Sequence, residues 1–274
     1  MSDAGKDTEE RTEALRSLAI DYLASCEEYT HPEERELLIT NWVAQQERTL
    51  GILADFKKRA GDPAGKRLLD IGHGSGSQLI AFAHAGAKVS GLEVNPVLGR
   101  IAAENFKAQG VTGDLRVYDG NRMPFEDGQF DYIFSASVLE HVTDAQMFIS
   151  EAARVLAPGG VFYLSFPNRY NIREHHTRIC WIGYLPRSWA SYIVRTFYKR
   201  NTVEEINLHF LSYLTLLRLL RPTDLRIRFE TNANSLSKRV LKYVLSKLGI
   251  HHSAFLRTVM VILEKPAINS THVS

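Results

Sequence analysis

Short apolar stretches alternate with longer amphipathic stretches through the middle of this chain. The apolar stretches, typical of buried strands, cover residues 67–71, 87–92, 114–118, 130–135 and 160–166. The amphipathic stretches, typical of helices, cover residues 77–85, 97–109 and 144–155. This alternation predicts a parallel sheet with helices on both faces, in which a ligand lies beyond the carboxyl ends of the strands.

The pattern extends in both directions from this region. Residues 225–230 alternate like a half-exposed strand, and residues 257–264 are apolar like a buried one. Between them residues 237–248 have helical periodicity, with Gly249 as the stop. Residues 11–29 also have the periodicity of an amphipathic helix. We therefore predict an α/β fold with a doubly wound, mostly parallel seven-stranded sheet and N-terminal helices.

The first predicted strand runs directly into a glycine-rich turn, Asp-Ile-Gly-His-Gly-Ser-Gly at residues 70–76. Glycines permit turn conformations that a Cβ forbids, and the following helix directs amides and the positive end of its dipole at a ligand. The second strand ends in Glu93, 17 positions after Gly76, where dinucleotide folds place the carboxylate that binds ribose hydroxyls. The spacing differs from G-x-G-x-x-G, which argues against a nicotinamide or flavin cofactor.

Four motifs in order resemble those of the class I S-adenosylmethionine-dependent methyltransferases. They are the loop at 70–76 followed by Glu93, the segment 119–125, the strand and loop at 130–141, and the segment 154–164 with its Pro-Gly-Gly turn. The resemblance covers residues 65–168. It implies a Rossmann-like sheet closed by an antiparallel last strand, with S-adenosylmethionine as the cofactor.

The resemblance also implies which residues hold the methionine and ribose parts of the cofactor. Asp70, Gly72 and Gly74 would frame the methionine part, and Glu93 would bind the ribose hydroxyls. His73 departs from the family, which more often has a small residue there. Its side chain would either touch the methionine carboxylate or pack outside the site.

The adenine part is implied to lie against residues that follow the second, third and fourth strands. Val94 would pack on the ring, and Asp119 with Gly120 would hold its edge. Ser135 would present its backbone carbonyl to the amino group. All of these residues come directly after predicted strands, which agrees with a ligand at the carboxyl edge of the sheet.

Methyl transfer to a hydroxyl group needs a base, and histidine suits this role near neutral pH. Candidates are His141 at the end of the fourth-strand motif, His175 and His176 farther along, and His209 before the chain returns to the sheet. We rank His175 and His141 first as catalytic residues, although a structural role is open for each. The sequence contains no cluster of Cys or His typical of a metal site, and no metal is expected.

Residues 169–200 interrupt the alternating pattern. They contain seven Lys or Arg residues, one acid (Glu174) and seven aromatic residues. This composition suits a helical lid that recognises a small-molecule or sugar-like acceptor with an anionic group. Two other interpretations are a solvated basic face and, for residues 185–198, an amphipathic helix in peripheral contact with a membrane. A nucleic-acid partner is not expected, because no RNA-binding motif accompanies the basic residues.

Composition supports a globular protein, with 45% hydrophobic and 23% charged residues and a net charge of +2. The polar N-terminus, two distant cysteines and the lack of a 20-residue apolar run predict a cytoplasmic protein. The predicted parts are an N-terminal helical cap (1–60), a cofactor-binding core (61–168), a basic aromatic lid (169–211), the completion of the sheet (212–265) and a disordered tail (266–274).

These observations predict a methyltransferase that uses S-adenosylmethionine. The acceptor would be a small molecule, a sugar or a lipid-like compound, methylated at oxygen. The alternative is a protein of the same fold that binds the cofactor without methylating, because fold alone does not determine function.

Overall fold

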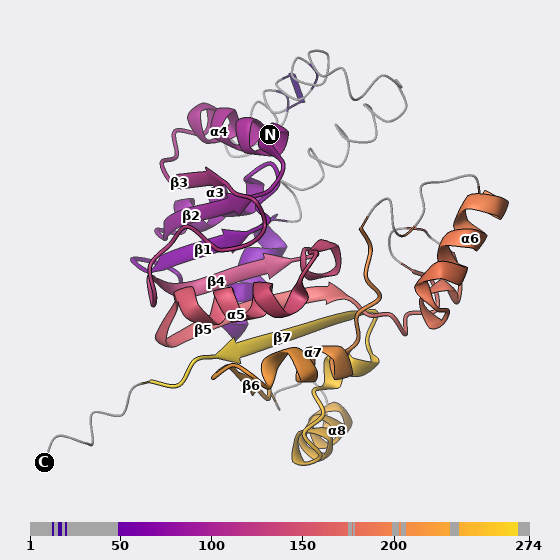
Figure 1. Ribbon diagram of the computed structural model, residues 1–274. Coiled ribbons are helices and arrows are strands. Elements are labelled where there is room, and N and C mark those ends of the chain that lie inside the picture. Colours follow the sequence, from indigo (N-terminus) through magenta and orange to yellow (C-terminus); the bar gives the residue numbers. More distant parts are fainter. Residues whose placement is uncertain are drawn as a thin grey trace, which may run out of the picture. The chain divides into compact units, whose positions relative to one another are not determined.

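A computed structural model describes residues 13, 16–17, 20, 49–174, 177, 179–198, 203, 207–230 and 236–267. The strands in these residues are β1 (Arg67–Ile71), β2 (Lys88–Glu93), β3 (Asp114–Val117), β4 (Phe130–Ala136), β5 (Leu156–Pro167), β6 (Arg226–Arg228) and β7 (Thr258–Glu264). They form one sheet in the order β3-β2-β1-β4-β5-β7-β6 (Figure 1). The predicted α/β fold with a mostly parallel seven-stranded sheet is therefore confirmed.

The chain divides into two compact units, residues 1–119 and 120–274. Helices of the first unit are α3 (Ser77–His84) and α4 (Pro96–Ala108), and residues 49–59 are also helical. The second unit contains α5 (Ala145–Val155), α6 (Arg187–Tyr198), α7 (Tyr213–Leu220) and α8 (Leu236–Lys247). Short 3₁₀ helices there are η1 (Leu139–His141), η2 (Ile182–Tyr184) and η3 (His252–Phe255).

In the first unit β1, β2 and β3 run parallel, as strands joined by crossover helices do. The register pairs Asp70 with Gly91 and Glu93 with Val117, so the loops after the three strands leave from the same edge. Both α3 and α4 pack on β2 and on each other. This packing positions the glycine-rich turn between β1 and α3.

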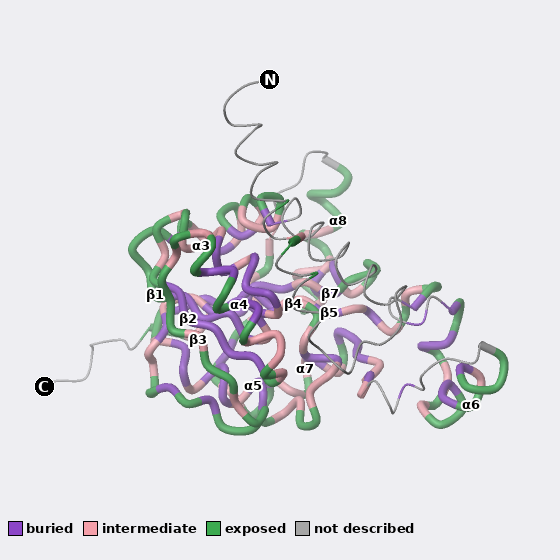
Figure 2. The backbone as a smooth tube through the Cα atoms, turned by 90° about the horizontal axis from the view of Figure 1, so that it is seen from above, coloured by how far each residue is buried: buried purple, intermediate pink, exposed green. Residues whose placement is uncertain are grey.

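In the second unit β4 and β5 run parallel, and β7 lies antiparallel between β5 and β6. The predicted antiparallel last strand is thus confirmed. Val259, Val261 and Leu263 of β7 are completely buried, as expected for a strand with neighbours on both sides. Helices α5 and α7 lie side by side in Figure 1, and Figure 2 shows the buried residues following the strands.

The fifth strand begins earlier than predicted, at Leu156 instead of residue 160. Its register to β4 shifts, because Phe130 pairs with Leu156 whereas Tyr132 pairs with Val161. The Pro-Gly-Gly sequence supplies the extra residues, with Gly159 at φ 78°. The turn expected between helix and strand is therefore a bulge at the start of β5.

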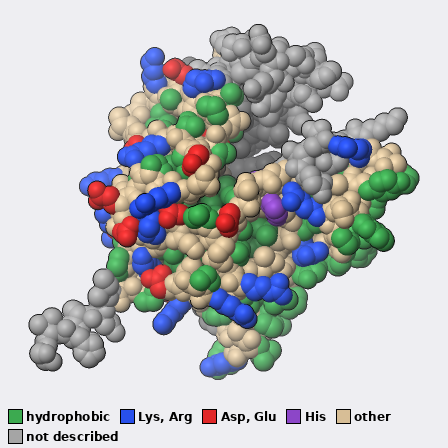
Figure 3. Space-filling view, viewed as in Figure 1, with side chains coloured by type: hydrophobic (Ala, Val, Ile, Leu, Met, Phe, Trp, Pro, Cys, Tyr) green, Lys and Arg blue, Asp and Glu red, His purple; other side chains and the backbone are tan. Residues whose placement is uncertain are grey.

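Residues 169–211 have a small apolar cluster of their own, which includes Ala190 and Val194 of α6. The opposite side of α6 carries Trp189 and Tyr192, and Figure 3 shows apolar side chains gathered over this helix. The prediction of an amphipathic helix here is confirmed. Among the described helices, none is long and apolar enough to cross a membrane.

Three predictions lie wholly or mostly outside the described residues. They concern the N-terminal cap up to residue 48, the histidines His175 and His176, and the polar tail after residue 267. These remain expectations from the sequence.

Candidate active site

The glycine-rich turn after β1 is held by the end of β2. The amides of Gly72 and His73 both donate to the carbonyl oxygen of Leu92, at 2.7 and 3.3 Å. Gly72, Gly74 and Gly76 have φ values of 78°, 55° and 78°, in the left-handed region that favours glycine. The sequence prediction that this turn needs glycine is confirmed, and its backbone is fixed without help from a ligand.

The carboxylate of Glu93, at the end of β2, also binds the same turn through hydrogen bonds. Its Oε2 accepts from the amide of Gly74 at 3.0 Å. Its Oε1 accepts from the amides of Val94 and Asn95 at 2.9 and 3.0 Å. Glu93 is only 6% exposed, and a carboxylate has about four acceptor positions. Three are used within the protein, so Glu93 positions the turn, and its role toward ribose stays a prediction.

Helix α4 supports the turn from another side. The buried amide of Asn105 donates from Nδ2 to the carbonyl oxygen of Ser75 at 3.1 Å. A Cβ at Gly76 would lie 3.1 Å from the Cβ of Ala102 and from Cε2 of Phe106. The glycine here is therefore required by close packing as well as by backbone conformation.

Gly74 differs from Gly76 because the space beside it is open. A Cβ at Gly74 would meet no atom within 4 Å. The adjacent helix α3 begins after Gly76, which supplies no side-chain cap, and its first turn contains no acidic residue. Uncapped amides at the positive end of a helix suit a carboxylate. The turn therefore fits the methionine carboxylate of S-adenosylmethionine.

Two buried polar groups lie beneath the turn. Asp70 is 1% exposed, and burial raises the pKa of its carboxyl well above the usual value, with the charge of Glu93 adding to the effect. His73 is 4% exposed, and burial lowers the pKa of its imidazole, opposed in part by Glu93. Asp70 Oδ2 and His73 Nε2 have no hydrogen-bond partner among the described residues. Asp70 thus lies under the turn, where it is enclosed by protein.

The position of His73 agrees with the second interpretation from the sequence, in which the ring packs outside the cofactor site. The ring points into the protein, where its Nδ1 lies 2.9 Å from the carbonyl oxygen of Gly74. A Cβ at Gly91 would lie 2.6 Å from Cδ2 of this ring. The ring therefore packs over β2, and Gly91 is the residue that makes room for it. A glycine inside a strand is the sequence signal that marks such a close approach.

The residues expected around the adenine differ in exposure. Val94 is 57% exposed, and Asp119, two residues after β3, is also exposed. Gly120 has φ 82°. Ser135 is completely buried within β4, so only its backbone could serve a ligand. The assignment of these four residues to the adenine stays a prediction.

The loop after Gly120 is held by Arg154 of α5. Its guanidinium donates to both carboxylate oxygens of Glu151, at 2.8 and 2.7 Å. It also donates to the carbonyl oxygen of Met123 at 2.9 Å and to that of Phe125 at 2.8 Å. Asp127 accepts a further bond at 2.8 Å. The bond from Arg154 lowers the pKa of Glu151. This network fixes residues 123–127, which overlap the segment 119–125 that resembles the family.

Two of the candidate histidines lie on adjacent backbone segments in the second unit. The amide of His209 donates to the carbonyl oxygen of Glu140 at 2.7 Å. The side-chain amide of Asn207 donates from Nδ2 to the carbonyl oxygen of His141. Its Oδ1 lies 3.2 Å from His209 Nε2. Because Asn207 Oδ1 accepts, His209 carries its proton on Nε2, which leaves Nδ1 unprotonated.

His209 therefore has the features of a general base. Burial and the positive charge of Arg187 lower the pKa of His209, so its ring stays neutral at pH 7. The sequence ranked His141 and His175 above it. Asn207, which orients the ring of His209, was not predicted from the sequence. Its position two residues before a histidine is the only feature of the sequence that indicates this role.

The comparisons with known proteins concern the domain and its fold. Residues 69–164 match the methyltransferase domain family. The demethylmenaquinone methyltransferase of Tropheryma whipplei (strain Twist) is 38% identical over 117 residues, covering 41% of this chain and 48% of that protein. The ubiquinone biosynthesis O-methyltransferase of Xanthomonas axonopodis pv. citri (strain 306) is 37% identical over 109 residues, covering 39% and 46%. The chain thus spans about half the length of these relatives.

Solved structures share the fold at low identity. The geranyl diphosphate C-methyltransferase from Streptomyces coelicolor A3(2), solved with S-adenosyl-L-homocysteine, has a TM-score of 0.54 and 16% identity, covering 86% of this chain and 82% of that one. The [4+2]-cyclase SpnF has a TM-score of 0.54 and 18% identity, covering 82% of each chain. The family match, the motifs and the sheet order agree: residues 69–164 are similar to the methyltransferase domain family, and the sheet has the strand order of a Rossmann-like methyltransferase fold.

Proposed function

We propose that this protein transfers a methyl group from S-adenosylmethionine to an oxygen atom of a small, lipid-like acceptor. The observation that carries the proposal is the turn at residues 72–76. Its backbone is fixed by Leu92 and Glu93, and it leaves open space beside Gly74. A loop fixed in this way binds a cofactor without having to be ordered first.

The protein's own residues would have three tasks in this reaction. When bound, S-adenosylmethionine supplies an activated methyl group, so positioning of the acceptor accounts for much of the catalysis. The amides at the start of α3 would hold the methionine carboxylate. His209 Nδ1 would accept the proton of the acceptor hydroxyl, while Asn207 keeps the ring in the required tautomer. His141, on the adjacent segment, is the alternative base.

The class of acceptor is proposed from the relatives. Their names refer to demethylmenaquinone, to ubiquinone biosynthesis and to geranyl diphosphate. These favour a lipid-like acceptor over a sugar. We propose that residues 169–211 form a lid over the acceptor, and that their cationic side chains would suit an acceptor with an anionic group.

A protein of this fold that binds the cofactor without methylating is the competing proposal. The name of one structural neighbour, a [4+2]-cyclase, supports this competing proposal, because it refers to a reaction other than methyl transfer. The test measures transfer of labelled methyl from S-adenosylmethionine to hydroquinones with alkyl or polyprenyl chains, beside His209→Gln. Transfer that is lost in the variant supports the methyltransferase. Tight binding of the cofactor without transfer to any hydroquinone would favour the competing proposal.

We also propose peripheral membrane contact through the outer face of α6. Trp189 and Tyr192 on this face are 66% and 65% exposed. Exposed aromatic residues on a cationic amphipathic helix are typical of interfacial binding. Trp189→Ser with Tyr192→Ser should abolish sedimentation with anionic phosphatidylglycerol vesicles. Equal sedimentation of the double variant and the wild type would contradict this contact.

A further inference from the structure

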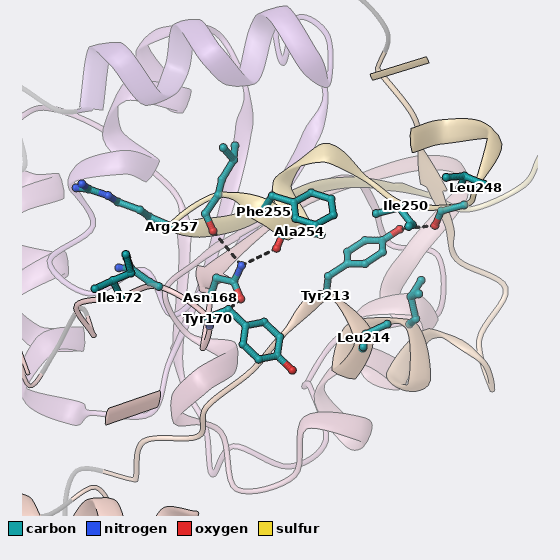
Figure 4. Close-up of a pocket in the computed structure, with 14 residues that line it drawn as sticks. Asn168, Tyr170, Ile172, Tyr213, Leu214, Leu248, Ile250, Ala254, Phe255 and Arg257 are labelled. Carbon is teal, nitrogen blue, oxygen red and sulfur yellow. Dashed lines mark hydrogen bonds between the residues drawn. The ribbon is translucent and has the colours of Figure 1, made fainter. Parts of the chain in front are cut away.

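A cavity of about 830 Å³ opens in the second unit, at the edge where β5 ends and β7 begins (Figure 4). Four separate segments line it: the turn after β5, the start of α7, the turn after α8, and η3 with the residues around it. Its volume lies in the range of about 300–1,000 Å³ that is typical of small-molecule sites. The proposed cofactor site and the histidine segments contribute none of its lining residues.

Two polar side chains in the cavity wall, those of Asn168 and Tyr213, are engaged with the protein itself. Asn168 Nδ2 donates to the carbonyl oxygens of Ala254 and Leu256, both at 2.9 Å (Figure 4). The hydroxyl of Tyr213 donates to the carbonyl oxygen of Gly249 at 3.0 Å. The bonds of Asn168 tie η3 to the end of β5, and the bond of Tyr213 ties the turn after α8 to α7. They also leave a ligand facing mainly hydrocarbon.

The rim of the cavity is apolar and open to solvent. Leu214, Leu248, Phe255 and Leu256 are 57%, 67%, 71% and 53% exposed. All four line the cavity. Large apolar side chains that gather around an opening mark a binding site more often than a plain surface.

We propose that this cavity binds the hydrocarbon chain of an amphipathic ligand, and that this ligand is the methyl acceptor. The second part rests on the proposed function. Residues 209–213 connect the two places, because His209 lies on the histidine segment and Tyr213 lines the cavity. Four residues span at most about 14 Å. The proposed ligand therefore has its polar head at His209 and a hydrocarbon chain that extends toward the cavity.

The experiment uses 11-(dansylamino)undecanoic acid as a fluorescent probe, displaced by n-alkanols of increasing length. Leu214→Asp is compared with Leu241→Asp, because both leucines are helical and both are 57% exposed, but only Leu214 lines the cavity. Leu248→Asp tests the opposite wall. Each protein is also titrated with S-adenosylhomocysteine.

Saturable probe binding is expected in the wild type, weakened at least tenfold in Leu214→Asp and Leu248→Asp and unchanged in Leu241→Asp. Each added methylene should strengthen alkanol binding about fourfold until the cavity is filled. Absence of saturable binding, or equal loss in Leu214→Asp and Leu241→Asp, would overturn the cavity proposal. If the wild type binds the probe but not S-adenosylhomocysteine, the cavity proposal stands and the proposed function fails.

Discussion

Gly74 and Gly110 form a matched pair for testing the cofactor turn. Their φ values are 55° and 61°, and a Cβ at either position would meet no atom within 4 Å. Gly74 lies in the turn before α3, whereas Gly110 lies in the turn after α4. An alanine therefore introduces the same backbone strain at both sites and no clash at either. Only Gly74→Ala adds a methyl group where the methionine part of the cofactor is proposed to lie.

The expected magnitudes follow from this geometry. A non-glycine residue in the left-handed region costs about 1–2 kcal/mol. In a protein of this size, each kcal/mol lowers the melting temperature by roughly 2–4 °C. Both variants should therefore melt a few degrees below the wild type. Gly74→Ala should in addition weaken cofactor binding at least tenfold, because close approach to the backbone requires glycine.

The assay is calorimetric titration with S-adenosylhomocysteine, together with thermal unfolding of the same samples. The wild type and Gly110→Ala should bind with equal affinity. If Gly74→Ala also binds as tightly as Gly110→Ala while both melt lower, the turn does not hold the cofactor. Because the strain is matched, a general loss of stability cannot produce the expected difference.

Three further predictions concern the buried ionisable groups. Burial raises the pKa of Asp70 above the usual 3.8, so the wild type loses stability as pH rises from that value. Asp70→Asn should flatten the curve of melting temperature against pH above pH 4. Arg154 lowers the pKa of Glu151 from 4.5, which stabilises the fold above that pH. Arg154→Met should therefore cost about 1–3 kcal/mol at pH 7 and less at pH 3, where only its bonds to the carbonyl oxygens of Met123 and Phe125 are lost, measured by urea unfolding. His209→Gln should lower kcat by about 10²–10⁴-fold and leave cofactor affinity unchanged. In the wild type, kcat should fall only below pH 6.5, because the pKa of His209 is lowered.

The parts of the site that could be predicted are encoded locally. The turn at residues 72–76 follows directly from the glycines after an apolar strand, and the alternation of strands and helices places Glu93 at the same edge. Glycine at a left-handed position and an acid at a strand end are each readable within a few residues. The position of β7 was also readable, because a strand with neighbours on both sides is apolar throughout.

The parts that could not be predicted depend on contacts between distant residues. Asn207 binds the carbonyl of His141, 66 positions earlier, and Asn105 binds that of Ser75, 30 positions earlier. Asparagines are common in turns, so the type of residue alone gives no indication of such a partner. The cavity draws its lining from four segments between residues 168 and 257, which no local pattern brings together.

Glu93 shows why the choice of variant matters for this site. A substitution there would remove three hydrogen bonds within the protein, from the amides of Gly74, Val94 and Asn95. Cofactor binding would then be lost whether Glu93 touches ribose or only holds the turn, because a displaced turn binds poorly in either case. An added methyl at Gly74 changes no such contact in the free protein. Loss of binding in Gly74→Ala, with binding retained in Gly110→Ala, would therefore show that the turn contacts the cofactor. The role of Glu93 can be tested separately only after that contact is established.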